Sequence, residues 1–273
     1  MDKTYNLNFH QTFYANLDYI SKILELSDGC LLRTLEEISS VTGIPTGKSS
    51  GKVLPHIVYA KYMNLIEYTN KNGNYQLTRT ILGEKIFIED PFLTEKITKL
   101  ICHYFLTSEV YGAEQWFFMY RNMQGKYGKK INVTVIKDEV GKFFKKSLKL
   151  TPFKGCYVNN LSFSNLNLLN ITAQTYEFLN FESMNEYYYA ILFCLVSELE
   201  QLDKNRKEFT GEEIFNNIKW QLAFNWSEKQ AMAFFEKTCN DGLTVLNRQM
   251  TPMTILFNVS SDMIVERIYS LLI

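Results

Sequence analysis

The residues most suited to chemistry form a short loop rich in glycine, serine and lysine, Gly47 to Lys52. Two overlapping stretches, Gly43 to Ser49 and Gly47 to Val53, invite comparison with the phosphate-binding loop of nucleotide hydrolases. That loop has four residues between its glycines, so that successive amides wrap a phosphate, whereas both stretches here have three. No buried strand precedes either stretch. The pattern therefore argues against nucleotide hydrolysis.

The same loop predicts contact with the backbone phosphates of a nucleic acid. Pro55 fits a helix only in its first turn, so a helix is expected to begin near Gly51. Free amides and the positive end of the helix dipole would then hold a phosphate oxygen. The side chains expected to assist are Lys48, Ser49, Ser50 and Lys52. The side chains predicted on the exposed side of the helix, within reach of base edges, are His56, Tyr59 and Asn64.

The segment from Thr34 to Arg79 predicts a winged helix-turn-helix that would position this loop. Apolar residues at positions 35, 38 and 41 mark a short helix, and those from Val53 to Leu65 mark a second one. Two alternating segments, 66–69 and 75–78, then flank an Asn-Gly pair that favours a tight hairpin. The second helix of such a unit fits the major groove of DNA. Winged helices also serve in dimerisation and protein docking, so these uses stay open.

Charge is unevenly distributed along a chain whose formal net charge is zero. Residues 43–80 contain five cations and one anion, and residues 121–149 contain nine and two. By contrast, residues 173–213 contain nine carboxylates and three cations, and two halves that neutralise each other would show the same asymmetry. We predict that the cations converge on one patch that binds double-stranded DNA. Beyond the loop, the predicted contacts are Lys71, Arg79, Lys126, Lys129, Lys130, Lys142, Lys145 and Lys146.

Composition argues against several classes of protein. The 273 residues are 46% hydrophobic, which is enough for a sizeable core. No apolar run approaches the roughly 20 residues that a membrane span requires, and no secretory signal is recognised, so a cytoplasmic protein is expected. Five scattered cysteines and three isolated histidines form no metal or redox motif. No nucleophile signature indicates an enzyme, so we predict no catalytic activity, no cofactor and no metal.

A mainly α fold in three parts is predicted. Residues 1–90 would form the winged helix-turn-helix domain, residues 91–155 a helical connector with the basic segment, and residues 156–273 a C-terminal helical domain. The boundary is placed in the loop-rich stretch from Thr151 to Asn160. In the last part, helices precede two short strands around residues 248–252, which suggests a second, winged-helix-like hairpin.

Several motifs resemble a bacterial family catalogued as domain of unknown function 4007. They are Phe9-His10-Gln11-Thr12-Phe13, the helix from Gly47 to Ile66, the connector from Leu77 to Gly83 with Asp90-Pro-Phe-Leu93, and the tryptophan helix from Ala113 to Trp116. The resemblance implies an accessory protein of prokaryotic antiphage islands, encoded near DNA phosphorothioation or other DNA-modification genes. It implies no catalytic residue, and it leaves the role of the His10-Thr12-Phe13 opening unassigned. The chain departs from the family in lacking a glycine before His10 and in carrying Pro55 inside the matched helix.

These observations favour non-enzymatic DNA binding or sensing within a defence or DNA-modification system, by a monomer or a homodimer. One alternative is a protein-docking adaptor, whose acidic C-terminal half would hold other subunits of such a complex. Another is a transcriptional regulator of its own operon.

Overall fold

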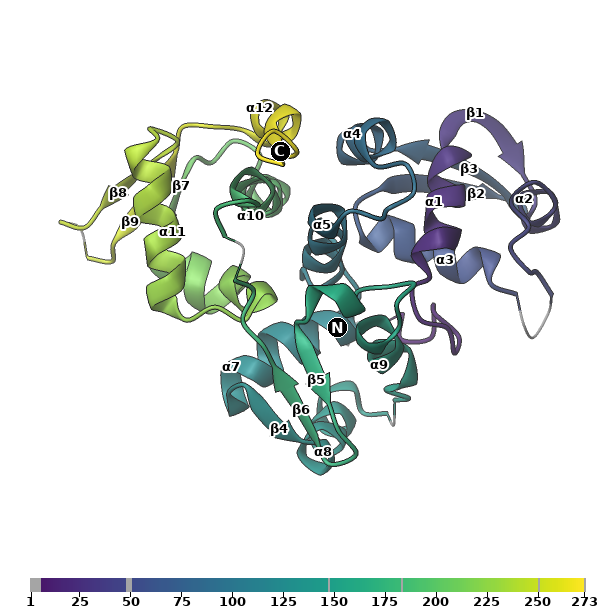
Figure 1. The fold of residues 1–273 in the computed structure, drawn as a ribbon, viewed down its shortest axis with the longest axis horizontal. Coiled ribbons are helices and arrows are strands. Elements are labelled where there is room, and N and C mark those ends of the chain that lie inside the picture. Colours follow the sequence, from purple (N-terminus) through teal and green to yellow (C-terminus); the bar gives the residue numbers. More distant parts are fainter. Residues whose placement is uncertain (1–5, 48–50, 147, 183, 250, 273) are drawn as a thin grey trace.

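Three small antiparallel sheets lie among helices in the computed structural model, which describes residues 6–47, 51–146, 148–182, 184–249 and 251–272 (Figure 1). About half of the chain is helical, in agreement with the predicted mainly helical fold. Within the described ranges, no helix has both the length and the apolar character needed to cross a lipid bilayer.

Each sheet belongs to a unit that contains, in chain order, a strand, two main helices and two further strands; the second unit along the chain also has the short η2 (Ser164–Leu166) after its second main helix, and the third has η4 (Trp220–Phe224) between its two main helices. In each unit the third strand lies between the other two and is antiparallel to both. Unit 1 consists of β1 (Asp28–Arg33), α2 (Leu35–Thr42), α3 (Val53–Tyr62), β2 (Ile66–Lys71) and β3 (Asn74–Arg79). Unit 2 consists of β4 (Lys130–Asn132), α8 (Val133–Phe144), α9 (Thr151–Val158), β5 (Leu169–Ile171) and β6 (Thr175–Phe178). Unit 3 consists of β7 (Glu208–Thr210), η3 (Glu213–Ile218), α11 (Glu228–Asn240), β8 (Thr244–Asn247) and β9 (Thr254–Phe257).

The repeat extends to individual hydrogen bonds. In each unit, the last residue of the central (third) strand donates its amide N–H to the carbonyl of the residue just before the first strand. The residue that follows the central strand donates its amide N–H to the carbonyl of the residue just before the second strand. The first bonds are Arg79 N to Ser27 O (3.0 Å), Phe178 N to Lys129 O (2.7 Å) and Phe257 N to Lys207 O (2.8 Å). The second bonds are Thr80 N to Leu65 O (3.1 Å), Leu179 N to Leu168 O (2.9 Å) and Asn258 N to Leu243 O (2.9 Å). The chain thus contains three copies of one structural unit.

Local sequence explains where the units turn. In unit 1, the Thr34 hydroxyl accepts from Glu37 N, and the Glu37 carboxylate accepts from Thr34 N. This reciprocal pair satisfies two backbone amides at the start of α2. Thr210 and Glu213 make the same reciprocal pair at the start of η3. After the second helix, Asn64 in unit 1 and Gly242 in unit 3 have positive φ, which turns the chain into the next strand.

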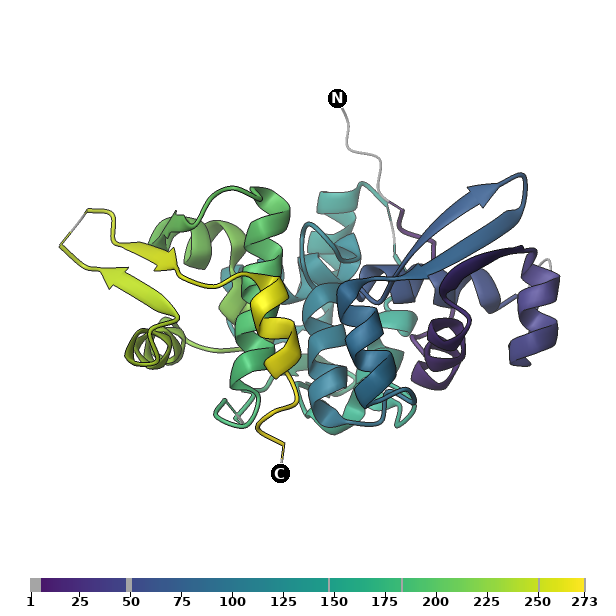
Figure 2. The ribbon, with the colours of Figure 1, turned by 90° about the horizontal axis from the view of Figure 1, so that it is seen from above.

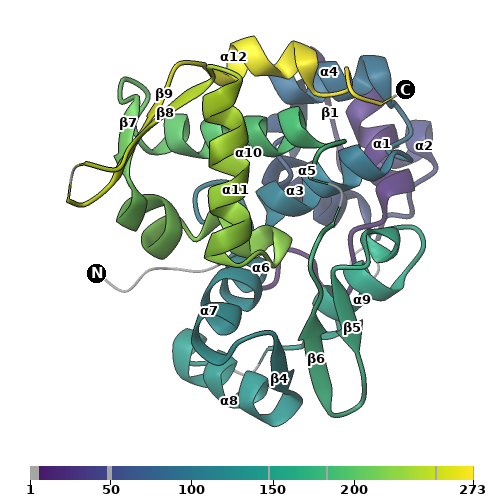
Figure 3. The same cartoon turned by 60° about the vertical axis from the view of Figure 1, so that its left-hand side comes forward.

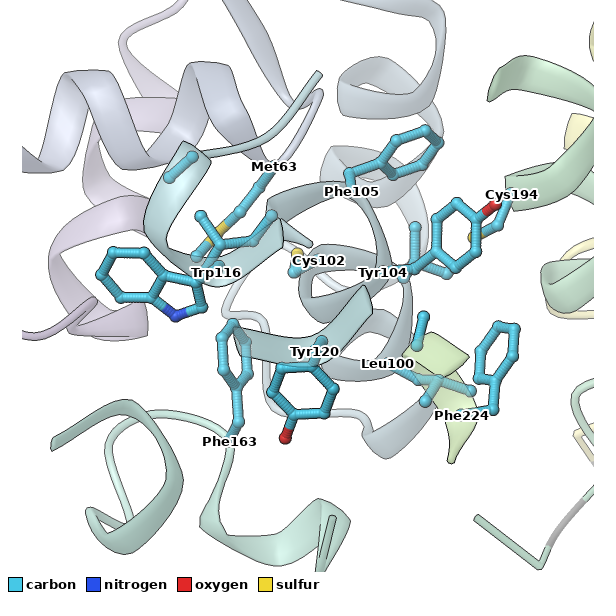
Figure 4. Close-up of a cluster of buried hydrophobic side chains, with 14 of the residues drawn as sticks. Met63, Leu100, Cys102, Tyr104, Phe105, Trp116, Tyr120, Phe163, Cys194 and Phe224 are labelled. Carbon is cyan, nitrogen blue, oxygen red and sulfur yellow. The ribbon is translucent and has the colours of Figure 1, made fainter. Parts of the chain in front are cut away.

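The three units are held together by α5 (Lys96–Leu106), which lies at the centre of the core (Figure 4). Around Leu100, Cys102, Tyr104 and Phe105 of this helix gather apolar side chains from all parts of the chain: Met63, Trp116, Tyr120, Phe163, Cys194 and Phe224. The remaining elements are α1 (Leu17–Glu25), α4 (Ile81–Glu89), α6 (Glu114–Phe117), η1 (Phe118–Met123), α7 (Gln124–Tyr127), η2 (Ser164–Leu166), α10 (Tyr188–Leu202), η4 (Trp220–Phe224), α12 (Ser261–Ile264) and η5 (Val265–Arg267).

A buried ion pair joins η1, which precedes unit 2, to α10, the helix that leads into unit 3. Arg121 of η1 donates from Nη1 to both carboxylate oxygens of Glu198 on α10, at 2.9 Å each, and to Ile218 O at 2.9 Å. The Glu198 carboxylate also accepts from Ser108 Oγ at 2.6 Å and from the Tyr104 hydroxyl. Because the Arg121 and Glu198 side chains are only 0% and 2% exposed, this network depends on mutual pairing rather than on water.

Units 1 and 3 lie at the two ends of the long axis, and unit 2 lies between and below them in Figure 1; Figure 2 shows the hairpins of units 1 and 3 projecting at opposite ends. The predicted boundary at residue 155 does not fit this arrangement. It places β4 and β6 in different domains, although Ile131 and Tyr176 pair within one sheet. The middle of the chain is therefore a folded unit of its own rather than a connector.

Candidate nucleic-acid interface

Helix α3, which was predicted to face DNA, is enclosed in the protein. His56 is 1% exposed and Tyr59 is 0% exposed, so the prediction that these side chains reach base edges is wrong. The N-terminal arm, residues 7–14, covers this helix. The Phe9 ring lies 4.9 Å from the Tyr59 ring, and the Tyr59 hydroxyl donates to Phe13 O at 3.0 Å.

Burial also fixes the chemistry of the two histidines near the arm. His56 donates from Nδ1 to Lys52 O at 2.6 Å and accepts at Nε2 from Asn16 N at 3.2 Å. Desolvation by burial lowers the pKa of His56 to about 4, so its ring is neutral at physiological pH. His10 lies buried against Gln115 of α6, with Nε2 3.2 Å from Oε1. Both histidines hold the N-terminal arm in place.

The predicted cations of unit 1 do not form one open surface. Lys48, Ser49 and Ser50 lie outside the described residues. Lys52 places its ammonium over the rings of Phe13 and Tyr19, at 5.3 and 5.7 Å.

Arg79 points inward, and its prediction as a backbone contact is wrong. Its guanidinium donates to Leu24 O and Glu25 O, both at 2.9 Å, and to the Glu84 carboxylate. The bonds to Leu24 and Glu25 tie the end of β3 to the end of α1. Of the predicted unit 1 contacts that the structure describes, Lys71, at the end of β2, is the one that is exposed.

The six predicted lysines around α7, β4 and α8 are all exposed: Lys126, Lys129, Lys130, Lys142, Lys145 and Lys146. Lys126 and Lys142 share Glu139, at 2.6 and 3.1 Å, and their hydrogen bonds lower the pKa of that carboxyl to about 2. Lys129 donates to the side-chain oxygen of Asn180. These are surface contacts, which a competing phosphate can replace at little cost.

A hollow at the end of α8 gathers three of the cations of unit 2. Its lining combines Lys137, Lys145 and Lys146 with the apolar Val140, Leu148 and Leu150, and its volume is about 500 Å³. Helix α8 stops at Lys145, whose φ of 53° lies in the left-handed region. Ammonium groups beside apolar side chains are suited to bind a phosphate ester whose organic part contacts those side chains.

Three more lysines of the same unit are exposed, Lys137, Lys149 and Lys154. Lys137 and Lys149 belong to the basic stretch that the sequence predicted, whereas Lys154 was missed. The reason is that residues 151–160 were interpreted as loop, whereas Thr151–Val158 is a helix, α9. Pro152 was the available signal, since proline is favoured in the first turn of a helix.

The predicted single patch is therefore divided. The β2–β3 hairpin, which contains Lys71, and α8 of unit 2 lie in different parts of the molecule in Figure 1, and Figure 3 shows α8 far from α1 and α2. Between them lie the N-terminal arm and α9, where Ala15 N donates to Cys156 Sγ at 3.4 Å. The exposed lysines that lie close together belong to unit 2.

The overall fold of the chain is similar to that of solved structures. A comparison with protein-family models finds none that matches the chain, and a comparison with curated proteins also finds no match. Among solved structures, the chain is similar to SspB, with a TM-score of 0.72, 14% identity, and coverage of 96% of this chain and 86% of that chain. A crystal structure of magnesium-bound SspB gives a TM-score of 0.70 with the same identity and coverage. At this identity the similarity establishes the fold alone.

We assign no residue of this chain to the magnesium ion of SspB. Within the described ranges, no group of three or more His, Cys, Asp or Glu side chains that could hold a metal ion is found.

Proposed function

We propose that this chain is a DNA-binding accessory protein of a prokaryotic antiphage defence or DNA-modification system, and that unit 2 makes the DNA contact. The observation that carries the proposal is the group of exposed lysines around the hollow at the end of α8. The biological context rests on the resemblance to the family of domain of unknown function 4007, and the chain shares its fold with SspB.

Each of the three units is proposed to be a winged helix. The order of strand, two helices and hairpin supports this assignment, as does the central position of the third strand. In winged-helix proteins that bind DNA, the second helix and the turn before it face the duplex. Unit 2 has the most cationic turn of the three, because Lys145, Lys146 and Lys149 all lie between α8 and α9.

Binding by these lysines would be driven by counterion release and would therefore depend on salt. On B-DNA the logarithm of affinity falls with the logarithm of salt concentration by about 0.9 per phosphate contact. Replacing three contacting lysines should lower that slope by about 2.7 and weaken binding at every salt concentration.

A gel-shift titration with a 30-bp duplex at several salt concentrations tests the proposal. The test variant carries Lys130→Ala, Lys137→Ala and Lys146→Ala. The control variant carries Lys204→Ala, Lys207→Ala and Lys229→Ala, which removes the same charge from exposed positions in and beside unit 3. We expect the slope to fall in the first variant and to stay unchanged in the second. Equal slopes in both variants would contradict the proposal.

The proposal assigns no catalytic residue to this chain. Incubation of supercoiled plasmid with the protein, with and without Mg²⁺, tests this part separately. The plasmid should remain supercoiled under both conditions. Conversion to the nicked or linear form that survives purification to homogeneity would contradict a purely non-enzymatic role.

An acidic hollow supports a second function, the docking of a basic segment from another subunit. It has a volume of about 390 Å³, and four carboxylates line it: Glu198 pairs with the buried Arg121, Glu213 pairs with Arg206 of the same lining at 2.6 Å, and the other two are Glu109 and Asp203. Leu202 at its rim is 51% exposed. A partner that docks here should be lost when Asp203→Lys is introduced, while DNA binding by unit 2 is retained, and co-purification measures this.

A further inference from the structure

The hydrogen-bond repeat makes α3, α9 and α11 equivalent helices, the second helix of their respective units. In a winged helix this is the helix that enters the major groove, so its exposure decides which unit can read DNA. The three helices differ sharply in this respect.

Helix α3 has no exposed residue, because the N-terminal arm and α6 cover it. Helix α11 has an open face of mixed charge, since its exposed residues include Glu228, Lys229 and Glu236, and Glu236 pairs with Arg248 of its own hairpin at 2.6 Å. Such a face attracts a polyanion weakly.

Helix α9 is open on one face and fixed on the other. Its exposed residues are Thr151, Lys154 and Val158, whose spacing of three and four residues places them on one side of the helix. Beside this face the helix packs on the arm, because a Cβ added to Gly155 would lie 2.7 Å from Tyr14 Cβ, and Cys156 Sγ accepts from Ala15 N at 3.4 Å on the side turned away from Thr151 and Lys154.

The open face of α9 follows directly on the cationic turn. Lys145, Lys146 and Lys149 precede the helix within six residues, and no acidic residue lies between Val140 and Cys156. At the far end of the face, Val158 and Leu161 are 52% and 47% exposed, which offers apolar surface of the kind that contacts thymine methyl groups.

We propose that α9 is the helix that this protein places in the major groove of DNA, with Thr151, Lys154 and Val158 toward the base edges and Lys145, Lys146 and Lys149 on the flanking phosphates. The inference rests on the proposed function and adds the reading surface to it. Unit 1 then serves as a scaffold, although its sequence has the most evident winged-helix pattern.

Photo-crosslinking tests the placement of α9 on the full-length protein. The photoreactive residue p-benzoylphenylalanine replaces Lys154 in one variant and Lys229, on the exposed face of α11, in a matched control. Both positions are exposed, so neither change disturbs the core. After irradiation with a labelled 30-bp duplex, primer extension maps each adduct to a nucleotide.

We expect adducts on bases from position 154 and none from position 229. We also expect Lys154→Ala to weaken binding by roughly five- to 150-fold, as for loss of a base contact, and to abolish protection of guanine N7 from methylation. If the unaltered protein shifts the duplex but position 154 gives no adduct, or position 229 gives as much, the inference about α9 is overturned and the proposed function stands. If the unaltered protein shifts no duplex, the proposed function itself fails.

Discussion

The buried pair of Arg121 and Glu198 yields a sharp prediction about what holds the three units together. Replacing Glu198 by Gln keeps the volume of the side chain but removes its charge, and this leaves the fully buried Arg121 guanidinium without a counter-ion. Within the described residues, Nε and Nη2 of Arg121 have no hydrogen-bond partner, and the group lies 4.9 Å from the Tyr104 ring. The Arg121 side chain is 0% exposed, so bulk solvent does not reach it to compensate the lost charge.

The expected loss follows from this burial. Breaking a buried ion pair by removing one partner costs about 3–5 kcal/mol, so both Glu198→Gln and Arg121→Met should lower the free energy of unfolding by that amount. The double variant Arg121→Met with Glu198→Leu should lose less than either single variant, because it leaves no unpaired charge. The matched control is Lys22→Met, which breaks an exposed pair with Asp18 at 3.2 Å and should cost about 0–1 kcal/mol.

Urea unfolding, followed by circular dichroism and tryptophan fluorescence at pH 7.5, measures these differences. A loss below about 1 kcal/mol in both single variants would refute the reasoning, because it would equate the buried pair with a surface one. Additive losses in the double variant would refute it as well, since they would show that the two groups act independently.

Three further predictions concern charge, pH and packing. Glu139→Gln should tighten DNA binding and steepen its salt dependence in gel shifts, because it releases Lys126 and Lys142 for phosphate; unchanged binding would place both lysines outside the interface. Lowering the pH from 7 to 5 should reduce the free energy of unfolding by roughly 2 kcal/mol for each of His56 and His103. Burial holds their pKa values at about 4 and about 3 in the folded protein, below the ordinary 6.5, so the stability that they contribute is complete above pH 6.5 and falls below it. Urea titrations at both pH values check this. In the His56→Gln variant, the loss of unfolding free energy between pH 7 and pH 5 should be smaller by the roughly 2 kcal/mol that His56 contributes. Gly83→Ala should lower the melting temperature, because the added Cβ would lie 1.8 Å from Leu65 O, whereas Gly141→Ala in α8 meets nothing within 4 Å and should raise it.

Much of unit 1 could be predicted because its signals are local. The Asn-Gly turn and the apolar spacing of α2 act within a few residues, and both elements lie close to where they were expected.

The orientation of α3 could not be read from spacing alone, because the arm that buries it comes from residues some 45 positions earlier. One signal was nonetheless present: the helix is apolar nearly all round, and such helices are buried. Unit 2 escaped prediction for a different reason. Strands β4 and β5 have three residues each, which is too short for a pattern of alternation, and α9 begins at a Thr-Pro pair that equally indicates a loop.

The most direct test of the account is an acetylation footprint of all lysines, quantified by mass spectrometry on the free protein and on the protein bound to a short duplex. The account predicts that DNA protects Lys130, Lys137, Lys146, Lys149 and Lys154, while Lys71, Lys204 and Lys229 react as before. Protection of Lys48, Lys52 and Lys71, with the lysines of unit 2 still reactive, would move the interface to unit 1 and contradict the account.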